Sequence, residues 1–203
     1  IEVIAEMYLA GIINQDGQVD GGMVAISPRV RANGRTFTYV VHDGEPLISI
    51  TQNDVRAIQL AKAALYAGVR LLMDKLGLTQ VDRIRLAGAF GSHIDVKYAM
   101  ILGLIPDCAL DHVSSAGNAA GTGARIALLN KAARDEIEAV VRRIAKIETA
   151  VEPKFQQHFV EAMAIPHKTA TYPNLSKVVT FPPIKEIQTL DDGGGERRKR
   201  RRG

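Results

Sequence analysis

Two glycine-containing segments have the residue types and spacing for chemistry on a bound ligand, and the first is residues 84–95. Ile84 and Leu86 alternate with arginines, a period of two that predicts a strand. Gly88 and Gly91 then remove side-chain bulk at its carboxyl end, where a flat or anionic group can approach the backbone. A tight turn with no ligand explains the same residues, because short glycine patterns arise by chance.

The second segment, residues 116–125, is nearly bare of large side chains. Asn118 is a suitable N-cap, and residues 119–130 are predicted to form a helix. A helix N-terminus carries unpaired N–H groups and a partial positive charge, both of which favour an anion. Small residues also allow a helix to pack closely on a neighbour, so the sequence leaves both interpretations open.

The sequence on either side of these two segments predicts the helices and strands that would position them. Asp95 is a suitable N-cap for a helix through Leu102 that ends at Gly103, and residues 113–115 are predicted to form a second short strand. A longer helix begins after Thr51, with Asp54 placed for a capping box and Gly77 for its left-handed end. Two apolar stripes predict a broad buried face on this helix: Val55, Ile58, Leu65, Val69 and Leu72, and beside them Leu60, Ala64, Ala67 and Leu71.

The remaining pattern predicts further helices and strands. Residues 1–10 are typical of an amphipathic helix, and Asn33-Gly34 indicates a hairpin. Strands are predicted over residues 24–26, 36–41 and 46–50, and helices over residues 134–147 and from Pro153 onward. In the helix over 134–147 we expect the apolar residues Ile137, Val140, Val141, Ile144 and Ile147 to face inward.

Composition narrows the class of protein. The 203 residues are 46% hydrophobic and 24% charged, as in one globular domain or a lobe of a larger protein. Because the pattern opens inside a helix, we expect a fragment of something longer. Six basic residues in 197–202 supply more than the net charge of +4, so the body is slightly acidic and we expect no nucleic-acid partner. No run is long and apolar enough for a membrane span, and the single cysteine, Cys108, suits a reducing, cytoplasmic location.

Three blocks of sequence together carry a resemblance to a known family. They are residues 86–95 with Gly103-Leu104-Ile105-Pro106, residues 117–124, and residues 51–64. In this order and separation they resemble the C-terminal half of the reductive activators of corrinoid-dependent enzymes. Those proteins are similar to the superfamily of acetate and sugar kinases, Hsp70 and actin.

The resemblance implies an α/β fold, an actin-like (RNase H-like) ATPase lobe with a mixed sheet flanked by helices. Residues 1–165 would be the second lobe of the ATPase domain and residues 166–190 an irregular C-terminal extension. Residues 191–203, rich in glycine and then basic, would be a disordered tail.

The resemblance also implies a function for the full-length protein. ATP hydrolysis would be coupled to reduction of cob(II)alamin to cob(I)alamin in a corrinoid protein or corrinoid-dependent methyltransferase. ATP and Mg²⁺ would bind between two lobes, and a [2Fe-2S] cluster would lie in an N-terminal domain outside this chain, in which no residues have zinc or iron–sulfur spacing. The catalytic residues would lie in the first lobe, so this fragment alone would be inactive. Its apolar helix faces make a homodimer plausible.

Mapped onto this sequence, the nucleotide-binding residues of the superfamily fall at Gly88, Ala89, Phe90, Gly91, Ser92, Asn118 and Gly121. The turn has Gly-Ala-Phe-Gly where many members have paired glycines, which leaves the contact of Ala89 open. Phe90 could stack on adenine or belong to the core, and Ser92 could bond a ribose or phosphate oxygen or cap a helix.

Two other functions are compatible with the sequence. One is a small-molecule kinase of the same superfamily, which would need a polar substrate pocket between lobes. The other is a non-catalytic assembly module, in which the glycines of both segments serve packing alone.

Overall fold

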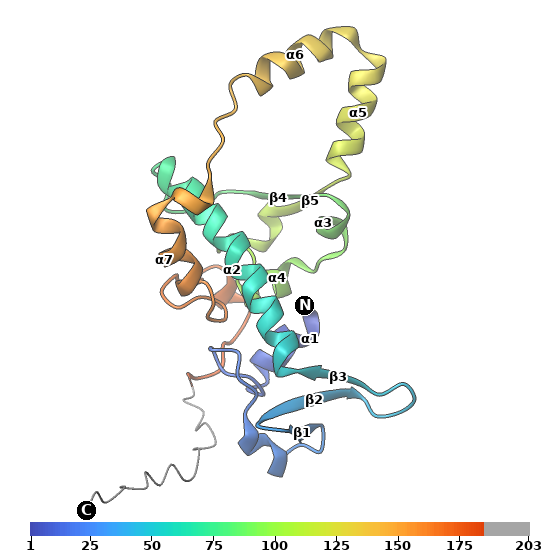
Figure 1. Cartoon of the computed structure of the whole chain (residues 1–203), viewed down its shortest axis with the longest axis vertical. Coiled ribbons are helices and arrows are strands. Elements are labelled where there is room, and N and C mark those ends of the chain that lie inside the picture. Colours follow the sequence, from blue (N-terminus) through green and yellow to red (C-terminus); the bar gives the residue numbers. More distant parts are fainter. Residues whose placement is uncertain (185–203) are drawn as a thin grey trace, which may run out of the picture.

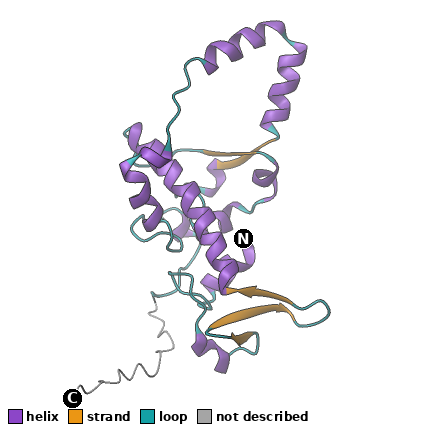
Figure 2. Ribbon diagram, in the orientation of Figure 1, coloured by secondary structure: helices purple, strands orange, loops and turns teal. Residues whose placement is uncertain are grey.

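The structure, a computed structural model, describes residues 1–184, apart from the side chains of Ala89 and Phe90. It is an α/β fold in which a long helix, α2, connects an antiparallel sheet to a parallel strand pair (Figure 1, Figure 2). The helices and strands are α1 (Glu2–Leu9), β1 (Val30–Asn33), β2 (Thr36–His42), β3 (Ile48–Thr51), α2 (Gln52–Lys75), β4 (Ile84–Ala87), α3 (Ala89–His93), α4 (Val96–Leu102), β5 (Val113–Gly117), α5 (Ala119–Leu129), α6 (Lys131–Val141) and α7 (Pro153–Glu161).

The hydrophobic core lies where α1, α2 and α4 meet. Ile4, Met7 and Tyr8 of α1 are buried there, which confirms the predicted amphipathic helix. Residues 99–102 of α4 are fully buried, and the helix has the predicted Asp95 N-cap and ends at Gly103 with a φ of 74°. Tyr172 and Leu175 join the same core, so the chain beyond residue 165 packs onto this body.

Both ends of α2 are as predicted. The Thr51 hydroxyl accepts the N–H of Asp54, and the Asp54 carboxylate accepts the N–H of Thr51, which completes the capping box. At the other end Gly77 has a φ of 67°, and the N–H of Leu78 donates to the carbonyl of Met73 at 2.9 Å. This is the hydrogen bond of a Schellman motif.

The predicted buried face of α2 is partly wrong. Leu60, Leu65 and Leu72 are 44%, 49% and 51% exposed, whereas Gln59 and Lys62 are buried. The reason is that α2 packs against α7 and the loop that follows it, and these two polar side chains bond that loop's carbonyls. The segments that pack on α2 therefore determine which of its faces is buried, and this is not the face with the most apolar residues.

The antiparallel sheet has the order β1-β2-β3 and contains the predicted hairpin, in which Asn33 pairs with Thr36 and Gly34 has a φ of 60°. The predicted strand over 24–26 is wrong, because a 3₁₀ helix, Gly21–Ala25, occupies this position. Its start is fixed by Asp20, whose carboxylate accepts the N–H of Gly22 at 2.9 Å. This local cap competes with an extended conformation.

The second sheet is the parallel pair β4 and β5, in the register Ile84 with Val113 and Leu86 with Ser115. Both predicted strands are confirmed. Parallel strands have their carboxyl ends at the same edge, so the turns that follow β4 and β5 are neighbours.

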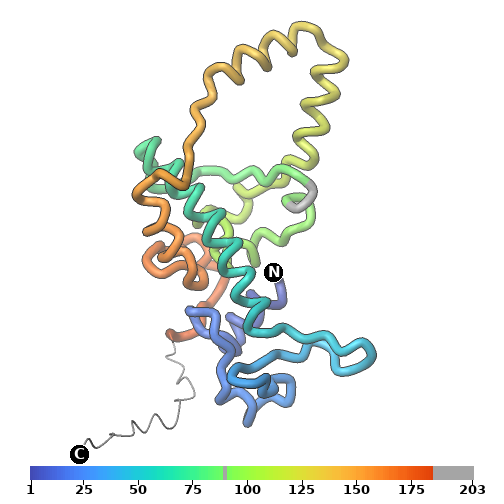
Figure 3. Tube along the Cα trace, viewed as in Figure 1, coloured from blue at the N-terminus to red at the C-terminus, as the bar shows by residue number. Residues whose placement is uncertain are grey.

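Helices α5 and α6 form an arm that projects from the rest of the molecule, as the chain trace makes plain (Figure 3). The prediction that the apolar residues of this region face inward is wrong: Ile137, Val140, Val141 and Ile144 are 42%, 41%, 59% and 66% exposed. Helix α6 ends at Val141, so Ile144 and Ile147 lie beyond it. Within residues 1–184, α6 packs chiefly on α5, which is too small a surface to cover this face. No helix in that range has the length and apolarity for crossing a bilayer.

Candidate functional site

The two glycine-containing turns predicted from the sequence lie side by side. The N–H of Gly88, after β4, donates to the carbonyl of Gly117 at the end of β5, at 2.8 Å. The Ser115 hydroxyl donates to that of Ser92 at 3.3 Å. A single open surface at the carboxyl edge of the parallel pair therefore carries both segments, the position at which α/β sheets bind ligands.

Gly88 and Gly117 leave main chain uncovered on this surface. Their φ angles are 97° and 61°, a region that favours glycine. A Cβ built on either residue meets no atom within 4 Å. Space therefore exists over both peptides for a flat group to lie against the backbone.

Gly91 has a different role. A Cβ at this position would lie 2.8 Å from the Leu86 Cβ and 2.9 Å from the Leu86 carbonyl carbon and oxygen. Backbone atoms of β4 cannot move away cheaply, so Gly91 allows α3 to pack on the end of the strand. Beside it, the exposed Ser92 hydroxyl donates to the Gly88 carbonyl at 3.2 Å and ties the turn together.

Asn118 and Gly121 form the start of α5. The Asn118 side-chain oxygen accepts the N–H of Gly121 at 2.9 Å, the predicted N-cap. A Cβ at Gly121 would lie 2.7 Å from the Asn118 Nδ2, so glycine makes room for the cap. Within the described part of the chain, the N–H groups of Ala119 and Ala120 have no hydrogen-bond partner. An anion at this end of α5 would accept hydrogen bonds from both groups.

Ala89 and Phe90 begin α3, a helix of one turn that runs to His93. Their side chains lie outside the described residues, so stacking by Phe90 and contact by Ala89 stay predictions. His93, the last residue of α3, is exposed.

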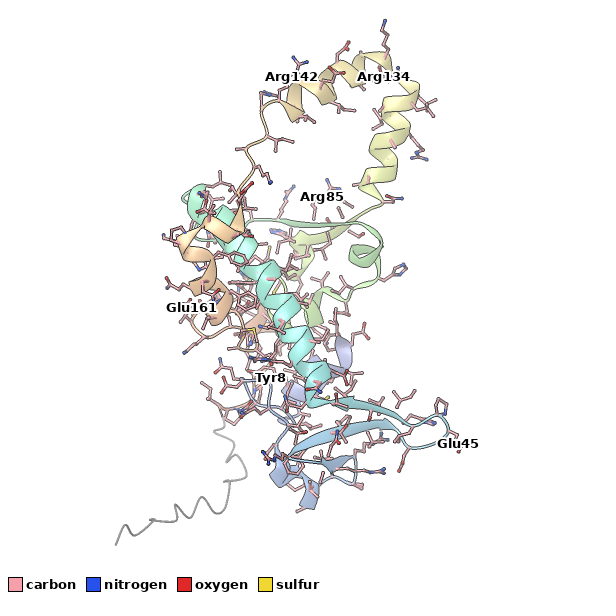
Figure 4. All side chains as sticks on the ribbon, viewed as in Figure 1. Tyr8, Glu45, Arg85, Arg134, Arg142 and Glu161 are labelled. Atoms are coloured by element: carbon pink, nitrogen blue, oxygen red, sulfur yellow. The ribbon has the colours of Figure 1, made fainter. Side chains whose placement is uncertain are left out.

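Arg85 was predicted only as part of the alternating pattern of the strand. The structure places it on the exposed side of β4, opposite Ser114 and beneath the α5–α6 arm (Figure 4). Alternation with Ile84 and Leu86 was the signal that could have identified this arginine as a solvent-facing cation close to the turns.

The chain does not fit an iron–sulfur cluster. Four cysteine ligands are the usual requirement, and the sequence has only Cys108. Its Sγ is buried and donates to the Asp82 carbonyl at 3.6 Å, and burial raises the pKa of the thiol. Among residues 1–184 no three His, Cys, Asp or Glu side chains gather as a metal site would require.

A parallel strand pair followed by two adjacent glycine turns and an open helix N-terminus is an arrangement at which α/β proteins bind ligands. Comparison with known proteins specifies the class. The model of the C-terminal domain of RACo, the ASKHA domain, matches residues 1–176. The chain belongs to this family, which confirms the resemblance and the fold class predicted from the sequence.

Two relatives carry informative names. The corrinoid activation enzyme RamQ of Eubacterium limosum is 37% identical over 172 residues, an alignment that covers 79% of this chain and 29% of RamQ. A solved structure, a reductive activator for corrinoid, iron-sulfur protein, is similar with a TM-score of 0.71 and 33% identity, over 81% of this chain and 27% of that one. The chain thus spans less than a third of each relative.

Proposed function

We propose that the chain is the C-terminal ATP-binding part of a protein that couples ATP hydrolysis to reductive activation of a corrinoid protein. Family membership and the names of both relatives support the activation role. The observation that carries the ATP part is the contact between the two glycine turns, Gly88 N–H to Gly117 carbonyl. Only side-by-side turns can present one surface to one nucleotide.

In this proposal the uncovered peptides of Gly88 and Gly117 lie against the adenosine, with Ser92 and the Phe90 position at its edge. The free N–H groups of Ala119 and Ala120 are donors for phosphate oxygens. Gly91, Asn118 and Gly121, which the sequence predicted to bind the nucleotide, also hold the turns in shape. Bound ATP supplies the free energy of hydrolysis, and Mg²⁺ would be held from outside this lobe.

The rest of the activity belongs to sequence that this chain does not cover, since it spans 29% of RamQ. We place there the [2Fe-2S] cluster, the residues that position the attacking water, and most of the contact with the corrinoid protein or methyltransferase. A cytoplasmic homodimer is part of the same proposal.

The lobe was predicted to end at residue 165, with an extension over 166–190 and a tail over 191–203. That division stays a proposal. Burial of Tyr172 and Leu175, together with a family match that runs to residue 176, supports a lobe that continues to about that point. The tail lies outside the described residues.

The test is calorimetric titration of the full-length protein with MgATP and, separately, with the Co(II) form of a corrinoid partner. We expect heat of binding with both, and ATP-dependent formation of Co(I) when a reductant is present. Binding of neither would refute the proposal. Phosphate transfer from ATP to a small acid or sugar would favour a kinase instead.

A further inference from the structure

A cavity lies at the other end of the parallel strands from the glycine turns. Its volume is about 520 Å³, and it is bounded by α2, α7, the loop after α7 and residues 79–81 and 106–107. Those two short segments precede β4 and β5, so the cavity is at the amino edge of the pair, away from the glycine turns. The residues important below are Tyr66, Arg70, His158, Glu161, His167 and Asn174.

His167 is fixed in one tautomer. Its Nδ1 accepts the N–H groups of Thr169 and Ala170 at 3.1 and 2.9 Å, so the proton is on Nε2. The residue is 6% exposed and its ring lies 4.7 Å from that of Tyr66. Burial lowers the pKa of His167 to about 4, which keeps the ring neutral near pH 7.

The Nε2–H of His167 is available to a ligand. Within residues 1–184 it bonds no protein atom, although every fully buried side-chain nitrogen or oxygen there has a partner. Nε2 is therefore not fully buried, and the cavity is a space that His167 lines. A nine-tenths-buried side chain thus presents one unused donor to a solvent-filled space.

Arg70 supplies charge on the same wall, one turn of α2 after Tyr66. One guanidinium nitrogen lies 3.1 Å from the Asp74 carboxylate, which also accepts from His158 at 2.9 Å. The Arg70 side chain is 32% exposed, and a guanidinium has five N–H donors, so several remain for a ligand. The ion pair with Asp74 therefore positions Arg70 but leaves other N–H groups of its guanidinium unused.

The carboxylates of the cavity are already engaged. Glu161 accepts from Gln157 at 3.0 Å and from Thr169 at 2.9 Å, and these bonds lower its pKa. Asp107 accepts three N–H groups, two from Asn174 and one from Leu175, at 2.9 to 3.0 Å. These bonds occupy part of the accepting capacity of both carboxylates, whereas Arg70 and His167 keep N–H donors that are unused.

We propose that this cavity binds a small oxyanion, an organic carboxylate or phosphate, between the Arg70 guanidinium and the Nε2–H of His167. Ligand pockets typically enclose about 300–1,000 Å³, so a compact metabolite fits this space. The site is separate from the glycine turns, and it goes beyond the proposed corrinoid activation.

The test is a titration of the 203-residue chain with inorganic phosphate and, separately, with succinate, followed through the ¹⁵N and ¹H resonances of the His167 imidazole. We expect a saturable shift of the Nε2–H signal with at least one probe, while Nδ1 stays an acceptor. The probe that binds more tightly identifies phosphate or carboxylate as the preferred group. No shift of His167 with either probe would overturn the proposal.

Two variants and a control separate binding from folding. R70Q removes the charge, and H167N keeps an acceptor for the two backbone N–H groups but loses the Nε2–H. R56Q changes an exposed arginine of the same helix. We expect affinity to fall about tenfold or more in R70Q and H167N, the loss typical of a charge-assisted or buried hydrogen bond, and to stay unchanged in R56Q.

Circular dichroism shows which variants fold. If H167N does not fold, the test relies on R70Q, in which the buried histidine is unchanged. The Tyr66 and Thr169 amide resonances then report binding to R70Q. Equal affinity of R70Q and R56Q would refute the assignment. This result is independent of ATP binding, because the glycine turns and their reporter amides lie at the opposite edge of β4 and β5.

Discussion

Lys62 shows how single residues hold this lobe together. It is 1% exposed on α2, and its ammonium donates to the main-chain carbonyls of Ala164 and, at 2.8 Å, Pro166. Nearby, Gln59 donates to the carbonyls of Asp16 and Met163, each at 2.9 Å. The two side chains join segments about a hundred residues apart, and their acceptors are backbone atoms that no residue pattern reveals.

The protonation of Lys62 should make stability depend on pH. Burial lowers its pKa from 10.5 to about 7. Between these values the unfolded chain holds a proton that the folded chain has released, so the free energy of unfolding rises with pH. The slope is at most about 1.4 kcal/mol per pH unit, and this contribution is lost as pH falls through about 7.

Urea unfolding at about pH 7 and about pH 9 measures the change in the free energy of unfolding between these pH values. Lys62 alone should contribute up to ~2 to 3 kcal/mol to this change. We expect K62M to lose the pH-dependent part and K168M, which removes an exposed lysine of the loop after α7 that Lys62 contacts, to keep it. An unchanged slope in K62M would assign the effect to other groups. If K62M does not fold, the ¹³Cε titration of Lys62 in the wild type gives the pKa directly.

The role of Gly88 can be separated from backbone strain by a matched pair of variants. Gly88 and Gly34 both have positive φ, and a Cβ on either meets open space. Replacement by alanine should cost each about 1 kcal/mol of folding free energy, for the same conformational reason. Only G88A should also weaken MgATP binding to the full-length protein, as measured by calorimetry. Equal affinity in G88A and G34A would remove Gly88 from the site.

At the scale of elements, the sequence correctly predicted the helix ends and the hairpin, which are determined by residues close together in the chain. The capping box at Thr51, the Gly77 end of α2, the Asp95 and Asn118 caps and the Asn33-Gly34 hairpin all depend on neighbours in sequence. The buried face of α2 and the arm of α5 and α6 depend on which elements lie opposite, so apolar periodicity predicted the helices but not their burial. The cavity around His167 could not be predicted, because it forms from segments far apart in the chain.

The arm gives an element-scale prediction. Ile137 is 42% exposed on α6, whereas Leu71 of α2 is 3% exposed. Since alanine is the better helix former, I137A should change the free energy of unfolding of this chain by less than about 1 kcal/mol. L71A should cost about 2–5 kcal/mol through the lost burial and the cavity it leaves. A loss of similar size in both variants, measured by urea unfolding, would show that the α6 face is covered.

At the scale of the whole molecule, the parallel pair brings two distant glycine turns to one edge and a polar cavity to the other. The strands and the glycines of the turns were predicted from the sequence, but their meeting at one edge depends on the parallel pairing of β4 with β5, which the structure shows. We expect this chain alone to hydrolyse ATP negligibly, because in our proposal the residues that position the attacking water lie in sequence that it does not cover. Phosphate release measured against a protein-free control checks this, and steady turnover would contradict it.

The most direct measurement is a ¹H–¹⁵N NMR titration of the chain with MgATP in the presence of inorganic phosphate, which occupies any simple oxyanion site. We expect the largest amide shifts to fall within residues 88–92 and 117–121, and adenosine alone to reproduce those of the first segment. Shifts confined to other parts of the chain, or none at either turn when the nucleotide is saturating, would contradict the claim that ATP lies against these two turns.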